Sequence, residues 1–335
     1  MTSMTSKIET SIQVFEANFV VAKKAFTLNS SMEACGCAAS FIGDTEPISE
    51  AALYNAKKFL KANTGLFSQV GRGNASQVVA ALLSKDPNPE YALSQIESIY
   101  KGLKKKFSSS DYPVLAATMI YKHIRPENYD DFINRIIQIY KLLHKEHPLI
   151  TGSEDIVNIT LMAMSEYSEQ QVAEECEKII CALHRPLRSK NDNQYMACVL
   201  SVFEGTPEEK ASSVLETRQL LKEHGVRFSG SGLSVVAAIS SLVKNGDLPA
   251  ICQEISIVGD RLKQIRGMGS LGAGKTIRNL IAAGIVVDAY CANGDIKVRS
   301  AIHSAIVSMI IETEIACVIA ASSAAAASAA AASSH

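Results

Sequence analysis

The chain has 335 residues, of which 47% are hydrophobic and 20% are charged, and its formal net charge is −1 at pH 7. This hydrophobic fraction is ordinary for a globular protein, and so small a net charge supplies no overall field that would attract nucleic acid or an anionic membrane. The sequence therefore predicts no nucleic-acid partner and no membrane partner. No uncharged apolar run is long enough to span a bilayer, because Glu312 and Glu314 interrupt the last candidate.

The N-terminal residues and the cysteines both bear on location. Residues 1–10 are polar and lack the apolar stretch of a signal peptide, which predicts a cytoplasmic protein. The eight cysteines form no paired zinc-binding arrangement. Cys35, Cys37, Cys176 and Cys181 are expected on helices as small buried groups. The sequence thus predicts no metal site and indicates no particular cofactor.

In chain order, the first predicted element is a leading helix within residues 1–29. Its apolar face is formed by Ile8, Ile12, Phe15, Phe19 and Ala22.

Helical hairpins are then predicted over residues 30–287 and closing helices over residues 288–319, so that residues 1–319 form one domain. Residues 320–335 are almost entirely Ala and Ser, and so little apolar area cannot hold a helix in place. We therefore expect a flexible tail there.

The clearest hairpin spans residues 107–148. Ser110 and Asp111 supply capping oxygen atoms at its start. The short helix that follows is apolar on most faces, which predicts burial on both sides. After a break at Pro126, a longer helix has apolar residues at the i, i+3, i+4, i+7 spacing of one helical face. These residues are Tyr129, Phe132, Ile133, Ile136, Ile137, Tyr140 and Leu143.

This hairpin pattern occurs about seven times in total. A pair of mostly small residues marks each short helix, and successive pairs lie 36 to 45 residues apart, which is the period of two-helix repeats. The pairs are Ala38-Ala39, Ala80-Ala81, Ala116-Ala117, Thr160-Leu161, Ala197-Cys198, Ala237-Ala238 and Ala282-Ala283. Without any good strand pattern, the sequence predicts an all-α fold of α/α hairpin repeats. They form either an open solenoid or a closed α/α ring, with short helices in one layer and longer helices in the other.

Charge follows the hairpins. Acidic residues such as Asp130 and Asp131 gather where the longer helices begin, and basic residues such as Lys104 and Lys105 gather where they end. Because connections of one kind share one edge of a stacked array, the pattern predicts an acidic rim opposite a basic rim. The same pattern also complements the helix macrodipoles, at about 0.3–1 kcal/mol per charge, and both interpretations remain open.

The segment Gly269–Thr276 matches the phosphate-binding pattern G-x-x-x-x-G-K-[ST]. A true P-loop follows a β-strand, whereas residues 251–265 read as an amphipathic helix. We therefore expect a glycine-rich connection, and nucleotide binding is the least favoured of three functions.

Polar residues gather in the connections that lead into the short helices. They suit helix caps, but if the array closes into a ring they would surround one ligand site. His144 and His147 could suggest a metal, yet a solvated histidine at a helix end is the simpler expectation, and no catalytic residue is predicted. The candidate ligand-binding residues are Ser110, Asp111, His147, Thr151, Asp155, Asn191, Gln194 and Lys275.

Three segments, residues 58–68, 147–155 and 267–272, together with the alanine-rich end, resemble one bacterial family. That family is catalogued as a domain of unknown function, number four thousand and three. The resemblance extends over nearly the whole chain and implies a cytoplasmic bacterial protein, mainly of low-GC Gram-positive bacteria. It implies no reaction, cofactor or catalytic residue.

Repetition without a concentrated catalytic set favours a non-catalytic protein that binds or scaffolds a protein or peptide partner. The alternative is an enzyme or small-ligand binder on an α/α ring, with its site at the connections into the short helices. Connections that meet around one pocket would favour the alternative, whereas connections spread along an open edge would exclude it.

Overall fold

The computed structural model describes residues 4–26, 31–108, 110–184, 186–187, 189–242 and 247–291. Every regular element in these ranges is a helix, which confirms the predicted all-α fold. None of the helices described is long and apolar enough to cross a bilayer. The predicted tail and most of the predicted closing helices lie outside these residues, and the last helix within them ends at Tyr290, three residues beyond the expected hairpin boundary.

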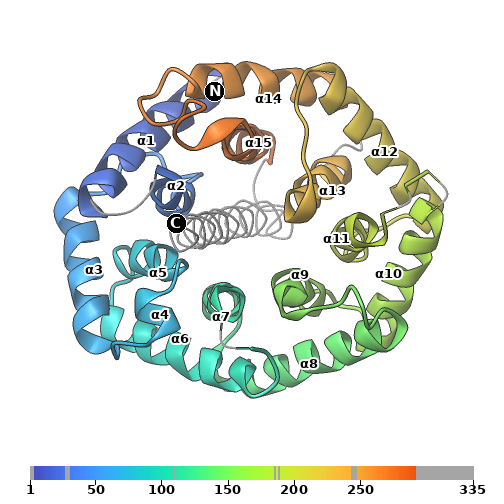
Figure 1. Ribbon diagram of the computed structural model, residues 1–335, viewed down its shortest axis with the longest axis horizontal. Coiled ribbons are helices and arrows are strands. Elements are labelled where there is room, and N and C mark those ends of the chain that lie inside the picture. The colour runs from blue at the N-terminus through green and yellow to red at the C-terminus, as the bar shows by residue number, and fades with distance from the viewer. Residues whose placement is uncertain are drawn as a thin grey trace, which may run out of the picture.

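The helices alternate in chain order between an outer and an inner layer, and together they form a closed ring (Figure 1). The outer layer contains α1 (Met4–Ala25), α3 (Glu50–Asn63), α6 (Pro89–Lys104), α8 (Tyr129–Glu146), α10 (Glu169–His184), α12 (Pro207–Glu223) and α14 (Leu248–Leu262). The inner layer contains α2 (Ser31–Ala39), α5 (Ser76–Leu83), α7 (Asp111–His123), α9 (Ile156–Ala163), α11 (Lys190–Leu200), α13 (Leu233–Leu242) and α15 (Gly274–Tyr290). Short helices lie in the connections: α4 (Gln69–Arg72), η1 (Pro126–Asn128), η2 (Ser153–Asp155) and η3 (Gly230–Gly232).

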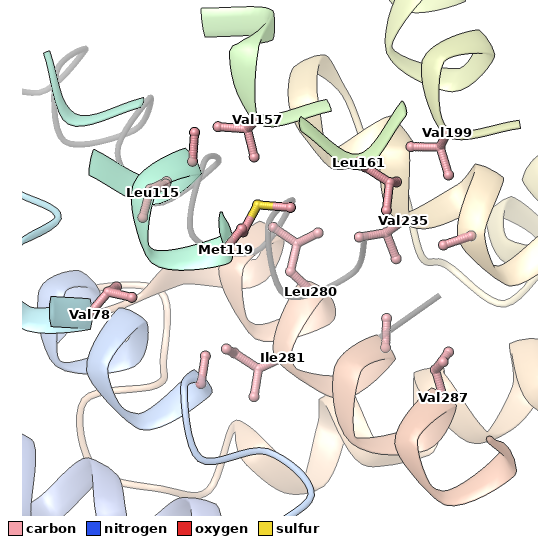
Figure 2. Close-up of a cluster of buried hydrophobic side chains, with 14 of the residues drawn as sticks. Val78, Leu115, Met119, Val157, Leu161, Val199, Val235, Leu280, Ile281 and Val287 are labelled. Carbon is pink, nitrogen blue, oxygen red and sulfur yellow. The ribbon is translucent and has the colours of Figure 1, made fainter. Parts of the chain in front are cut away.

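The inner helices are the short helices marked by small residues in the sequence. Each of the seven pairs lies in one described inner helix, and every member of a pair is buried. Small side chains at these positions let an inner helix approach its two inner neighbours and the outer helices behind it. Apolar side chains of several inner helices point toward the middle of the ring (Figure 2). Those labelled there, among them Leu115, Met119, Leu161 and Leu280, are buried.

The outer helices bury one face each, as their periodicity predicts. In α8 the buried side chains include Phe132, Ile133, Ile136 and Leu143. The buried face differs slightly from the predicted one, because Ile139 is also buried while Ile137 and Tyr140 are only partly covered. The reason is that α8 packs against α6 and α10 on its two sides as well as against α9.

The ring closes where the first helix meets the last two described. Helix α1 packs against α15, and Phe19 of α1 lies under the connection between α14 and α15. A Cβ atom added at Gly267 in that connection would stand 3.4 Å from Cε1 of Phe19, and Gly267 has a φ of +103°. The positive φ disfavours a side chain at position 267, and the distance of 3.4 Å places Phe19 in ordinary van der Waals range of this connection. Because α15 packs against both α1 and α2, the hairpins form the closed ring and not the open solenoid.

The outer helices follow the perimeter, so that the end of one meets the start of the next (Figure 1). Basic residues at two helix ends pair with acidic residues near the next helix starts. Arg261 of α14 donates to Glu9 of α1 at 2.9 Å, and Lys24 of α1 donates to Glu50 of α3 at 2.9 Å. Both pairs are exposed and contribute little stability. They nevertheless show that acidic residues at helix starts and basic residues at helix ends can pair between neighbouring outer helices.

Candidate functional site

The N-terminal ends of the inner helices adjoin one another on one side of the ring. We call this side the entry face; it comprises these helix ends and the connections leading into them, residues 64–75, 105–111, 147–155, 186–193, 224–232 and 263–275, as far as the structure describes them. Hydrogen bonds join the start of one inner helix to the start of the next. They run from Ala75 N to Asp111 Oδ1 (3.0 Å), from Ser108 N to Ser153 Oγ (3.4 Å), from Thr151 Oγ1 to Gln194 Oε1 (3.3 Å) and from Ser234 Oγ to the Tyr195 carbonyl (3.4 Å).

Asp111 is the most constrained of the predicted residues on this face. It is the first residue of α7, and its buried carboxylate accepts the amide hydrogen of Ala75 just ahead of α5. A Cβ atom at Gly73 would stand only 2.3 Å from Asp111 Oδ1, so this approach requires glycine. Burial raises the pKa of the Asp111 carboxyl, and the amides of Ala75 and Asn74 partly oppose that shift. Asp111 therefore tethers two inner helices.

We expect Asp111→Ala to lower the free energy of unfolding by about 1–3 kcal/mol, because the buried Ala75 amide loses its acceptor. Asp111→Asn keeps an acceptor oxygen and is the matched control, with a smaller expected loss at neutral pH. Urea denaturation of the three proteins measures the difference. Equal losses for the alanine and asparagine variants would contradict the tether.

The same variants predict a pH dependence. The folded-state pKa of Asp111 is raised above that of the unfolded chain, which is about 3.9. The folded state therefore holds this proton more tightly, and protonation of Asp111 favours folding. As the pH falls from neutral toward 4, the wild-type protein should gain stability relative to Asp111→Asn. A difference that does not change over this range would contradict the assignment.

A second polar cluster joins α9, α11 and α13. The Thr151 hydroxyl donates to Gln194, and the Asp155 carboxylate accepts the Gly152 amide hydrogen at 2.8 Å. The Ser234 hydroxyl lies 3.4 Å from Asn158 Oδ1. Three buried polar atoms in this region have no hydrogen-bond partner: Asn193 Oδ1, Gln194 Nε2 and Ser231 Oγ. Of the eight predicted residues, the structure thus brings Thr151, Asp155 and Gln194 into one region.

His147 is not the solvated helix-end residue expected from the sequence. It caps the end of α8, is partly buried, and its Nε2 lies 2.5 Å from Glu177 Oε2 of α10. His144 Nδ1 lies 3.0 Å from the Thr151 carbonyl oxygen. Both rings therefore hold α8 against its neighbours. In the described ranges, no three His, Cys, Asp or Glu side chains are grouped in a way that could hold a metal ion.

The remaining predicted residues are scattered. Ser110 precedes α7, and its buried hydroxyl has no hydrogen-bond partner. Asn191 and Lys275 are exposed, on α11 and α15 respectively.

The segment Gly269–Thr276 follows helix α14 and not a strand, as the sequence indicated. Several of its amides are already used within the connection. Ala273 N donates to the Gly267 carbonyl at 2.9 Å, and Gly274 N donates to the Gly269 carbonyl at 3.1 Å. These amides point into the connection itself, and a nucleotide-binding role gains no support from this geometry.

Several buried polar residues in the inner helices and in η3 were not anticipated. Asn158, Ser231, Ser234, Arg278 and Asn279 are all buried. Asn158 and Arg278 are polar residues within the mostly apolar sequences of α9 and α15, and that interruption was the available signal. Glu177, the partner of His147, gave no signal because it lies on the polar side of its own helix.

A sequence model for a family described as "Protein of unknown function (DUF4003)" matches residues 18–324. The match covers most of the chain and confirms the resemblance seen in residues 58–68, 147–155 and 267–272. No curated protein and no solved structure matches the chain.

Proposed function

The chain belongs to the family described as "Protein of unknown function (DUF4003)", and we propose a function from the residues of this chain. It is a non-catalytic binding or scaffold protein that holds a basic segment of a protein partner. Its expected cytoplasmic location and bacterial origin are part of the same proposal. Several predicted site residues support a structural role. Asp111, Thr151 and His147 are occupied in joining neighbouring helices.

The side of the ring opposite the entry face carries the chemistry that favours such a partner. We call it the exit face; it comprises the connections that lead from inner to outer helices, residues 40–49, 84–88, 124–131, 164–169 and 201–209. Contacts there also run from one hairpin to the next: Lys85 Nζ lies 2.6 Å from Asp44 Oδ2, and the Tyr121 hydroxyl donates to Asp86 Oδ2 at 2.7 Å.

Acidic side chains dominate the exposed part of the exit face, and this observation carries the proposal. The exposed basic residues in or beside these connections include Lys85, Lys122 and Arg125. The exposed acidic residues are more numerous and belong to several successive connections: Glu46, Glu127, Asp130, Asp131, Glu166, Glu204, Glu208 and Glu209. A surface of one sign attracts a partner of the opposite sign and raises its association rate.

A second candidate is a small polar ligand at the starts of α9, α11 and α13. It is favoured by the unpaired buried atoms Asn193 Oδ1, Gln194 Nε2 and Ser231 Oγ. Each such atom costs about 1–3 kcal/mol, which a ligand with matching donors and acceptors would recover. Because the ring is closed, these residues lie around one face and not along an open edge, so the alternative stated from the sequence is retained.

Capture from a lysate of the source cells tests the favoured function. The bait proteins are the full chain, an exit-face variant with Glu127→Gln, Asp130→Asn and Asp131→Asn, and an entry-face control with Lys104→Gln, Lys105→Gln and Lys106→Gln. Three exposed charges at about 0.5 kcal/mol each correspond to roughly tenfold in Kd. We expect a protein that is retained by the wild type and the control, is largely lost by the exit-face variant, and elutes with salt.

Two results would reject the proposed function. One is the same set of captured proteins for all three baits. The other is turnover of a small molecule by the purified chain with no specific protein captured.

A further inference from the structure

We propose that the entry face docks on the surface of an anionic phospholipid bilayer, with apolar side chains from three connections entering the lipid among surrounding lysines and arginines. This inference goes beyond the protein partner proposed for the exit face and does not depend on it.

The first observation is the exposure of four large apolar side chains. Relative exposure is 75% for Leu66, 97% for Phe67, 96% for Leu149 and 107% for Leu271, whereas the next most exposed large apolar residue described, Tyr54, reaches 57%. All four belong to the entry face. They occupy the connections from α3 to α4, from α8 to η2 and from α14 to α15.

Their distribution separates these residues from ordinary exposed hydrophobics. Single apolar residues scattered over a surface need no explanation. Here the most exposed ones occupy three connections that are far apart in sequence but all belong to the entry face. A flat partner surface can meet three such points at once, whereas a narrow groove-binding peptide cannot.

The connections are ordered by hydrogen bonds that leave the apolar side chains outside. Arg72 donates from Nε to the Gly65 carbonyl and from Nη2 to the Lys61 carbonyl, each at 3.2 Å, and so braces the turn that carries Leu66 and Phe67. Around Leu271, Gly272 N donates to the Gly269 carbonyl at 3.0 Å. These turns are therefore folded, and they hold the apolar side chains exposed to water.

The second observation is charge. Exposed acidic residues in or near these connections include Glu146, Glu154, Glu223 and Asp260. The exposed basic residues are more numerous: Lys58, Lys61, Arg72, Lys101, Lys104, Lys105, Lys106, Lys145, Lys190, Arg227, Lys263, Arg266 and Lys275. Lysines and arginines beside inserted apolar groups are the combination that binds anionic lipid surfaces, because the two attractions add.

The expectation of no membrane partner rested on the net charge of the whole chain. That argument fails for a ring whose two faces carry opposite charge, because the acidic exit face cancels the basic entry face in the net charge. Surface docking also needs no helix that spans the bilayer.

A tryptophan reporter tests the insertion directly. The chain contains no tryptophan, so Phe67→Trp in the full chain provides a single fluorophore on the entry face, and Tyr54→Trp provides a control on an outer helix. With vesicles of phosphatidylcholine and phosphatidylglycerol, we expect a blue shift for Phe67→Trp and none for Tyr54→Trp. Vesicles of phosphatidylcholine alone should give a weaker response, because they lack the anionic surface.

Co-sedimentation with the same vesicles completes the test. Serine at Leu66, Phe67, Leu149 and Leu271 should weaken binding at least about tenfold, while serine at Tyr54 and Ile257, exposed apolar residues of outer helices, should not. Circular dichroism verifies that each variant is folded. The proposal is overturned if the wild type binds neither vesicle, if the four-serine variant binds as well as the wild type, or if the entry face retains a protein and no lipid.

Discussion

Replacing Phe132 with alanine should lower the free energy of unfolding by about 3–5 kcal/mol. Phe132 lies in the first turn of α8, is buried, and belongs to the core between the two layers. Truncating a buried aromatic side chain removes its apolar area from the interior and leaves a cavity that the surrounding helices refill only in part. The change therefore measures whether the amphipathic face of α8 is the face that packs.

Asp130→Ala is the matched control for this substitution. Asp130 lies two residues away on the exposed side of the same helix, so its loss affects only the macrodipole and should cost less than about 1 kcal/mol. Chemical denaturation of both variants, followed by circular dichroism, gives the comparison. Small and equal effects would mean that the helix does not face the core as described.

Phe19→Ala should have an effect of the same size, about 3–5 kcal/mol, for a different reason. Phe19 is fully buried, stacks on Phe15 at 6.1 Å between ring centroids, and lies against Gly267. In an open array the first helix would cover one end, and its loss would loosen that end alone. In the closed ring Phe19 of the first helix also packs against the connection that leads into α15, so its loss should loosen both helices.

Hydrogen exchange in the native state distinguishes these two situations. In Phe19→Ala the amides of α15 should lose protection together with those of α1, because the two helices pack directly. Val20→Ala is the control, since Val20 lies next in sequence but is exposed. Unchanged protection of α15 in Phe19→Ala would contradict closure through this contact.

The layers of the fold could be read from the sequence because their signals are local. The pair Ala116-Ala117 indicates a helix packed on all sides, and the spacing from Phe132 to Ile136 indicates a helix packed on one side. Both are buried as predicted. Closure could not be read in this way, since every hairpin has nearly the same local pattern in a ring and in a solenoid. The angle between neighbours arises from packing summed over the whole ring.

The errors have the same origin. Cys181 was expected to be buried but is exposed, because five positions separate it from the buried Cys176 and turn it to the opposite side of α10. His147 was expected in solvent but meets Glu177 of the next outer helix. The candidate residues lie at or beside the starts of inner helices or the end of an outer helix, but which of them join neighbouring helices depends on contacts between hairpins.

The contact between α1 and α15 also constrains how such a protein can change over evolution. An open array can lengthen or shorten by one unit at its edge, and every other junction keeps its geometry. In a circle, one additional hairpin would alter the angle at each junction at once, so that all the interfaces would have to be repacked together. We therefore expect members of this family to keep the number of hairpins while the residues within each hairpin change.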